Sequence, residues 1–200
     1  MSSITIIGAG NMGSAIAGLA LAAGSQVQVL TREATEVDPR VTAGTVGDEI
    51  TGDVVVLALP YGALDDVLGA YEGRLDGKVL VDITNPLDFA TFDSLVVPDG
   101  SSAAAQIQER VPGARVLKAP RPTPPPPPPP APAGPPPPPV PAAGDDADAK
   151  AALAGAVSGV RVVDAGSLKR AHELEALGFL QLTLAAGEKT SWTTGFALAE

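Results

Sequence analysis

The chain has 200 residues, a net charge of −10 and a hydrophobic content of 45%, which suits one domain with an apolar core. The acidic balance disfavours nucleic acid as a partner, because a phosphate backbone repels negative charge. With no cysteine and one histidine, the chain has no disulfide or thiolate metal site and cannot build a zinc site. We see no apolar run long enough to cross a membrane and no export signal. A cytoplasmic location is therefore expected.

Short β-branched runs alternate along the chain with helical patterns. Strands are predicted over 3–7, 27–30, 53–60, 78–83, 114–119 and 159–165. Helices are predicted after the first strand up to Gly24, and over 61–71, 101–110, 145–157 and from 167 to 177 or beyond. Ser101 and Asp145 are suitable N-caps. Between Arg32 and the segment 41–46 too few residues remain for a crossover helix, so a turn is predicted there.

This alternation predicts an α/β fold: a Rossmann-type, doubly wound, mostly parallel sheet with helices on both faces and a small helical C-terminal part. A single domain, 1–200, is expected to contain three segments. Residues 1–119 form the dinucleotide-binding core, 120–141 a proline-rich tract of uncertain status, and 142–200 a C-terminal strand and helices.

The segment from Gly8 to Gly13 reads G-x-G-x-x-G, directly after a predicted strand and at the start of a predicted helix. Gly8 permits a tight turn, Gly10 lets backbone amides approach a pyrophosphate, and Gly13 allows close packing of helix on strand. The helix N-terminus then offers N–H groups and partial positive charge to an anion. The alternative is a glycine-rich turn without a ligand.

The end of the second strand predicts which dinucleotide binds. An NAD site usually places a carboxylate here for the ribose 2′-hydroxyl, whereas this chain has Thr31 and Arg32. A hydroxyl and a guanidinium suit a 2′-phosphate, so NADP is favoured. Glu33 leaves an alternative open, because an inward-pointing carboxylate would orient Arg32 or bind the ribose of NAD itself.

Two further strand ends carry candidate residues for the other half of the cofactor. Leu59 and Pro60 end the third strong strand, beside the expected switch point of the sheet, where open α/β sheets bind ligands. They are predicted to wall the nicotinamide ribose. The alternative is that Pro60 merely ends the strand. Asn85 suits the nicotinamide carboxamide or a substrate carbonyl, and the alternative is an Asn-Pro turn.

Five motifs together resemble one known family. "TIIGAGNMG", Thr31-Arg32, "VVVLALPY", "DITNP" and "DAGSLKRAHELEALGFLQLTLA" are similar to the NADPH-dependent coenzyme F420 reductases, to their actinobacterial relatives and to the reductase domain of the STEAP metalloreductases. The resemblance covers 3–119 and 142–200. It implies hydride transfer between NADPH and a deazaflavin, coenzyme F420, without a catalytic acid or base. The predicted cofactor-binding residues are Gly8, Ala9, Gly10, Asn11, Met12, Gly13, Thr31, Arg32, Leu59, Pro60 and Asn85.

The proline tract departs from that family. Residues 120–141 hold 16 of the 21 prolines, where the resemblance implies an aromatic-Asn-Thr stretch beside the active site. Polyproline II is expected over Pro124–Pro130. The tract is interpreted as an exposed loop that docks a protein partner, as a silent low-complexity insertion, or as an error in the sequence itself.

The C-terminal part adds two smaller hypotheses. His172 lies among charged neighbours and is expected on the surface, with proton donation to a deazaflavin as the alternative. Trp192 and Phe196 are expected to pack in the core or against a second copy in a homodimer, or to stack on a flat ring. The main rivals to an F420 reductase are another small NADPH reductase, acting on an imine, quinone or metal, and a non-catalytic NADP-binding module.

Overall fold

The computed structural model describes residues 1–120 and 139–192. In chain order its elements are β1 (Ser3–Ile7), α1 (Asn11–Ala22), β2 (Gln26–Thr31), β3 (Thr42–Thr45), β4 (Val54–Leu57), the 3₁₀ turn η1 (Tyr61–Ala63), α2 (Leu64–Ala70), β5 (Val79–Asp82), α3 (Ala103–Arg110), β6 (Arg115–Lys118), β7 (Pro139–Ala142), α4 (Ala147–Ala156), β8 (Arg161–Asp164), the 3₁₀ turn η2 (Leu168–Arg170) and α5 (Ala171–Ala186).

Six strands form the main sheet in the order β3-β2-β1-β4-β5-β6, and every neighbouring pair is parallel. The chain starts in the middle at β1, winds outward through β2 and β3, and returns to continue on the other side with β4. This reversal is the switch point of a doubly wound sheet. The predicted α/β, Rossmann-type fold is confirmed.

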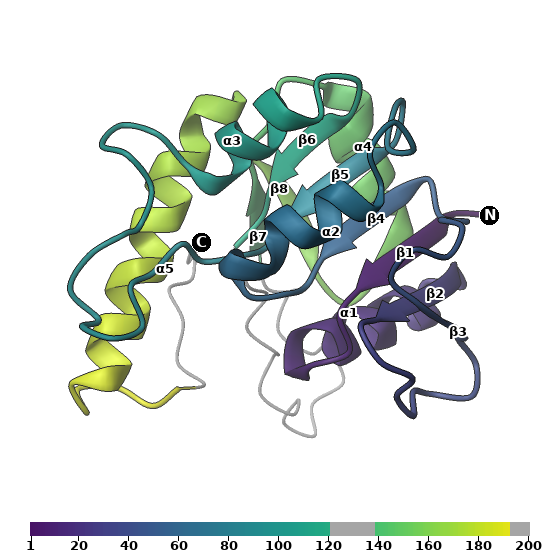
Figure 1. Ribbon diagram of the computed structural model, residues 1–200, viewed down its shortest axis with the longest axis horizontal. Coiled ribbons are helices and arrows are strands. Elements are labelled where there is room, and N and C mark those ends of the chain that lie inside the picture. The colour runs from purple at the N-terminus through teal and green to yellow at the C-terminus, as the bar shows by residue number, and fades with distance from the viewer. Residues whose placement is uncertain (121–138, 193–200) are drawn as a thin grey trace, which may run out of the picture.

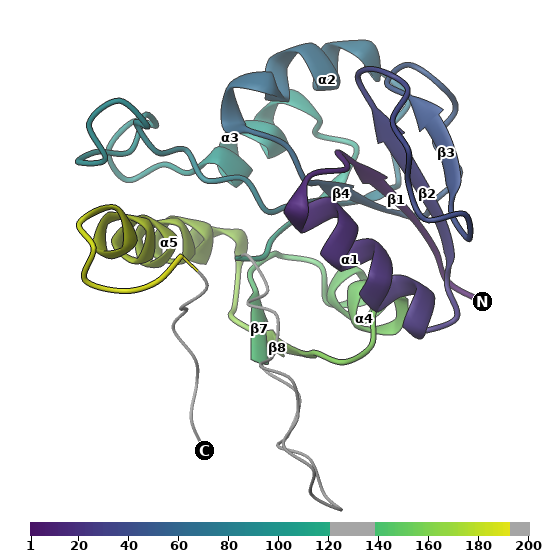
Figure 2. The same ribbon diagram turned by 90° about the horizontal axis from the view of Figure 1, so that it is seen from below.

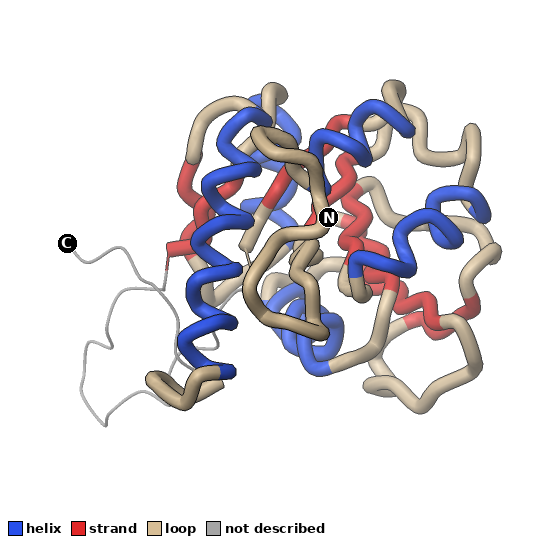
Figure 3. The backbone as a smooth tube through the Cα atoms, turned by 60° about the vertical axis from the view of Figure 1, so that its left-hand side comes forward, coloured by secondary structure: helices blue, strands red, loops and turns tan. Residues whose placement is uncertain are grey.

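Helices cover both faces of this sheet, as Figures 1 and 2 show, and Figure 3 shows the strands in red among the blue helices. One face packs on α1 and α4 through a core that includes Ile6, Val56 and Leu153. The other packs on α2 and α3 through Leu57, Leu80 and Ile107. The central strands β4 and β5 are almost continuous apolar runs because both of their faces are buried.

The predicted elements differ from the structure at several ends. The strand predicted over 53–60 is shorter in the structure, where it is β4 and ends at Leu57. Its pairing with β1 ends with the hydrogen bond from the Ala58 N–H to the Ile7 carbonyl. The helix caps lie one residue later than predicted. Ser102 rather than Ser101 accepts from the Ala105 N–H, and Asp146 rather than Asp145 from the Ala149 N–H. In both places the sequence offers two adjacent residues that are able to cap.

The largest difference concerns the last strand. β8 does not join the main sheet but pairs in parallel with β7, which contains Pro139 and Pro141. In a strand, the backbone polar groups of alternate residues point to opposite sides. The two prolines, which lack an N–H, therefore fall on the side away from β8, and Val140 and Ala142 direct their polar groups toward β8. Ala142 indeed accepts from the Ala165 N–H at 2.9 Å. The end of the proline tract thus belongs to the fold, whereas the predicted polyproline II segment lies outside the described residues.

No helix among the described residues is long and apolar enough to cross a membrane. Figures 1 and 2 show α5 extending beyond the main sheet, with the loop 86–100 alongside it. Within this pair of segments the Thr183 hydroxyl lies 3.3 Å from the Phe92 carbonyl oxygen, and the Phe92 and Trp192 rings meet edge to face.

Candidate functional site

The predicted site residues come from four strands whose carboxyl ends meet at one edge of the sheet. The glycine loop follows β1, Thr31 ends β2, Leu59 and Pro60 follow β4, and Asn85 follows β5. Because these strands are parallel neighbours, their ends lie side by side across the switch point between β1 and β4. Open α/β sheets bind ligands at this position.

The three glycines of the loop are required for different reasons. Gly8 has a φ of +116°, and a Cβ there would lie 2.1 Å from the Ala58 carbonyl oxygen. A Cβ at Gly13 would lie 1.9 Å from the Gly8 carbonyl oxygen. The fold itself therefore excludes side chains at both positions. At Gly10 a Cβ would meet nothing within 4 Å, and its φ of −68° is open to any residue. Nothing in the described fold demands a glycine at this position.

The N-terminus of α1 is left open in the same place. No side chain caps it, and its first turn contains no acidic residue, so the N–H groups of Asn11 and Met12 retain their capacity to bind an anion. The N-terminus of α3 differs, because Glu175 accepts from the Ala103 N–H at 3.0 Å and Ser102 from the Ala105 N–H. Exposed Gly10 and the uncapped helix together fit a pyrophosphate.

The end of β2 presents a guanidinium to solvent. Arg32 is exposed, and among the residues that the structure describes it makes no ion pair. The hydroxyl of Thr31 is less available than the sequence indicates, because it donates to the Glu33 carbonyl at 2.6 Å. Glu33 is exposed rather than inward-pointing. The geometry therefore leaves Arg32 as the group that is free to bind a phosphate here.

Leu59 is half-buried and Pro60 exposed beyond β4, where the chain turns into η1. Asn85 is half-buried beyond β5. The residue before it, Thr84, is 2% exposed, and its hydroxyl is a buried atom without a hydrogen-bond partner in the described part of the chain. These positions are compatible with the predicted cofactor contacts, and the roles of the individual residues stay predictions.

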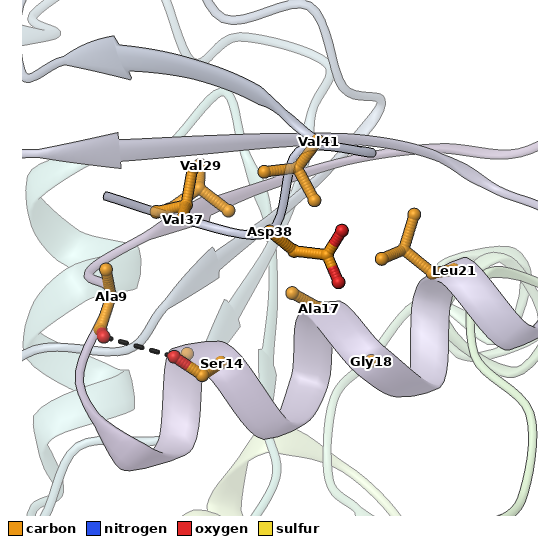
Figure 4. Close-up of a pocket in the computed structure, with 10 residues that line it drawn as sticks. Ala9, Ser14, Ala17, Gly18, Leu21, Val29, Val37, Asp38 and Val41 are labelled. Carbon is orange, nitrogen blue, oxygen red and sulfur yellow. Dashed lines mark hydrogen bonds between the residues drawn. The ribbon is translucent and has the colours of Figure 1, made fainter. Parts of the chain in front are cut away.

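A groove of about 180 Å³ lies between α1 and the segment that connects β2 to β3. In Figure 4 Val37, Asp38 and Val41 of this segment face Ala17 and Leu21 of α1. The connection is too short for a helix, as predicted, and the space that such a helix would occupy is left as the groove. Ala9 lines one end of it, so the groove opens beside the glycine loop.

A buried ionic cluster was missed by the sequence reasoning. Lys118 Nζ lies 2.8 Å from Asp82 Oδ2 and 3.0 Å from Glu175 Oε1, and the three side chains are at most 2% exposed. Asp82 and Lys118 are register partners at the ends of β5 and β6. Burial raises the pKa of Glu175, and the charge of Lys118 opposes that shift. Asp82 and Lys118 stand at the ends of otherwise largely apolar strands, and this pattern could have indicated a buried ion pair. No sequence pattern indicated that Glu175 would join it.

The sequence predicts His172 on the surface, but the structure places it only partly in contact with solvent. It is half-buried, and its Nδ1 lies 3.0 Å from the Ser101 carbonyl oxygen, because the first turn of α5 packs against the start of α3. Trp192 is 53% exposed and contacts Phe92 rather than the core. Phe196 lies outside the described residues.

The fold and the glycine loop at its switch point define a Rossmann-type domain. Residues 3–86 match the family model described as NADP oxidoreductase, coenzyme F420-dependent. This match and the relatives below confirm the resemblance that the sequence motifs indicate.

Three relatives extend the comparison. An F420-dependent NADP reductase of Methanocaldococcus jannaschii is 29% identical over 147 residues, which are 71% of this chain, and the match spans 66% of that relative's length. A crystal structure from Arthrobacter sp. FB24, named as a candidate F420-dependent NADP reductase, is 26% identical, covers 100% of both chains and has a TM-score of 0.80. An imine reductase of Myxococcus stipitatus in complex with NADP⁺ shares the fold, with 21% sequence identity and a TM-score of 0.64. The match covers 94% of this chain and 63% of the imine reductase.

Proposed function

We propose that this protein is an NADP-dependent oxidoreductase that transfers hydride between NADPH and a deazaflavin of the coenzyme F420 type. The observation that carries the proposal is Gly10, a glycine that the described fold does not require, beside an uncapped helix N-terminus. A bound dinucleotide explains both features. The family match over residues 3–86 and the names of the relatives support the nicotinamide cofactor and the deazaflavin.

In this proposal the chain binds and orients, and the bound cofactors supply the hydride chemistry. The amides around Gly10 hold the pyrophosphate, and Arg32 holds the 2′-phosphate. Leu59 and Pro60 wall the nicotinamide ribose, and Asn85 holds the carboxamide. No side chain acts as an acid or base, so the rate depends on how well the protein holds two rings in contact and excludes water.

We further propose that the protein acts in the cytoplasm on small-molecule cofactors. A homodimer stays a prediction. The docking of a protein partner on the proline tract also stays a prediction, since residues 121–138 lie outside the described part of the chain.

The assignment of Arg32 predicts cofactor preference. Arg32→Ala should weaken NADPH binding about tenfold or more, because a charge-assisted contact contributes roughly 1.5–3 kcal/mol. NADH, which has no 2′-phosphate, should bind almost as before. Isothermal titration calorimetry with both cofactors measures the difference, and equal losses for the two would contradict the assignment.

Arg40→Ala is the matched control, since it removes the same charge from the same connecting segment. The Arg40 guanidinium is engaged by Asp38, through Nε to Oδ1 at 2.9 Å and Nη2 to Oδ2 at 2.6 Å. This hydrogen bonding lowers the pKa of Asp38 to about 2. We expect a much smaller change in NADPH affinity for this variant than for Arg32→Ala.

A further inference from the structure

The buried ionic cluster holds the backbone immediately before Asn85 from two sides. The Thr84 N–H donates to Asp82 Oδ1 at 2.8 Å, and Lys118 Nζ donates to the Thr84 carbonyl at 2.6 Å. Both polar groups of the Thr84 backbone are thus bound by charged side chains that are themselves buried. Hydrogen bonds to charged groups are stronger than neutral ones, so the direction in which the chain leaves β5 is closely determined.

The same cluster attaches α5 to this edge of the sheet. Glu175, in the second turn of α5, accepts from the N–H groups of Ala103 and Ala104 at 3.0 and 3.4 Å and forms the ion pair with Lys118. Its carboxylate therefore joins three elements: the start of α3, the end of β6 and α5 itself. Helix α5 cannot move relative to β5 and β6 without breaking these buried contacts.

Gly178 lies three residues after Glu175, so the two occupy the same face of the helix. A Cβ added at Gly178 would lie 2.8 Å from Asn85 Oδ1, which is closer than such contacts allow. The absence of a side chain at Gly178 is what admits the Asn85 side chain in its present position. Asn85 has no hydrogen bond to a described residue, so packing against α5 is what places its amide.

We infer that the face of α5 formed by Glu175 and Gly178 positions Asn85 for the carboxamide of the nicotinamide ring. Glu175 acts through Lys118 and Thr84 on the backbone, and Gly178 acts directly on the amide side chain. Both are positioning residues. This inference rests on the proposed function, because Asn85 needs a fixed position only if it binds a ligand group.

Gly178→Ala tests the inference without threatening the fold. The atom that the new methyl group meets is the end of a movable side chain, and alanine is the better helix former, so the melting temperature should not fall. NADPH should bind about 3- to 10-fold more weakly, as expected for one misdirected hydrogen bond. Binding of 2′,5′-ADP, which lacks the nicotinamide half, should not change.

Gly155→Ala is the control, because a Cβ at this exposed position of α4 meets only Ser2 Oγ, at 3.8 Å. It should leave both affinities unchanged. The double variant Asn85→Ala/Gly178→Ala separates an effect through Asn85 from any other. If Gly178 acts through Asn85, the double variant binds NADPH no more weakly than Asn85→Ala alone.

Unchanged NADPH binding by Gly178→Ala, losses that add in the double variant, or equal weakening of 2′,5′-ADP would each overturn the inference. These results differ from failure of the proposed function, in which the unmodified protein binds neither NADPH nor 2′,5′-ADP. That outcome would overturn the proposed function and the role of α5 with it.

Discussion

The Gly10→Val variant is expected to fold like the unmodified protein and to bind NADPH roughly 100-fold more weakly or worse, a loss of about 2.7 kcal/mol. The position tolerates a side chain in the described structure, since a Cβ there meets nothing within 4 Å. A branched side chain would instead occupy the space in which the pyrophosphate approaches the backbone amides. Calorimetry measures the binding, and circular dichroism with thermal melting checks the fold.

Gly13→Ala provides the contrast within the same loop. Its new Cβ would lie 1.9 Å from the Gly8 carbonyl oxygen. Because that oxygen belongs to the backbone, it cannot move aside as the end of a flexible side chain can. This variant should therefore lose stability, whereas Gly10→Val should lose only binding. If Gly10→Val is folded and binds NADPH like the unmodified protein, the glycine loop does not hold the dinucleotide.

Lys118→Met is expected to lower the free energy of unfolding by about 3–5 kcal/mol. Methionine fills much of the same space but leaves the carboxylates of Asp82 and Glu175 buried without their shared cation. It also removes the donor to the Thr84 carbonyl. Urea denaturation at neutral pH measures the loss, and the denaturant midpoint shows it even if the variant is only marginally stable.

Lys78→Met is the matched control for this change. Its ammonium lies 3.8 Å from Asp53, whose side chain is 82% exposed, and such pairs contribute at most about 1 kcal/mol. We expect a small effect on unfolding. Losses of similar size for the two variants would show that the buried cluster does not contribute as its geometry indicates.

Features set by local sequence were predictable. The parallel sheet followed from β-branched runs alternating with helical patterns, and the short connection between β2 and β3 followed from the number of residues available. The glycine loop was recognisable because a strand precedes it and a helix follows. The motif also assigned Gly8 and Gly13 to the turn and to helix packing, but the sequence did not show that the Ala58 carbonyl is the group that approaches Gly8.

Features set by contacts between distant segments were not predictable. Glu175 lies in a mixed-charge stretch that reads as a solvated helix face, and only the position of α5 against α3 and β6 explains its burial. The pairing of β7 with β8 was missed because prolines argue against a strand, although two prolines on one side of an edge strand are compatible with pairing. The same argument applies to His172, whose neighbour Ser101 is far away in sequence.

Hydride transfer itself tests the central claim most directly. The unmodified protein, saturated with NADPH, is mixed with coenzyme F420 in a stopped-flow instrument, and the absorbance of the deazaflavin and of NADPH is followed together. The proposed function predicts that both fall in equal amounts, and that NADH at the same concentration reacts much more slowly. Tight NADPH binding without any change in the deazaflavin, or equal rates with NADH, would contradict it.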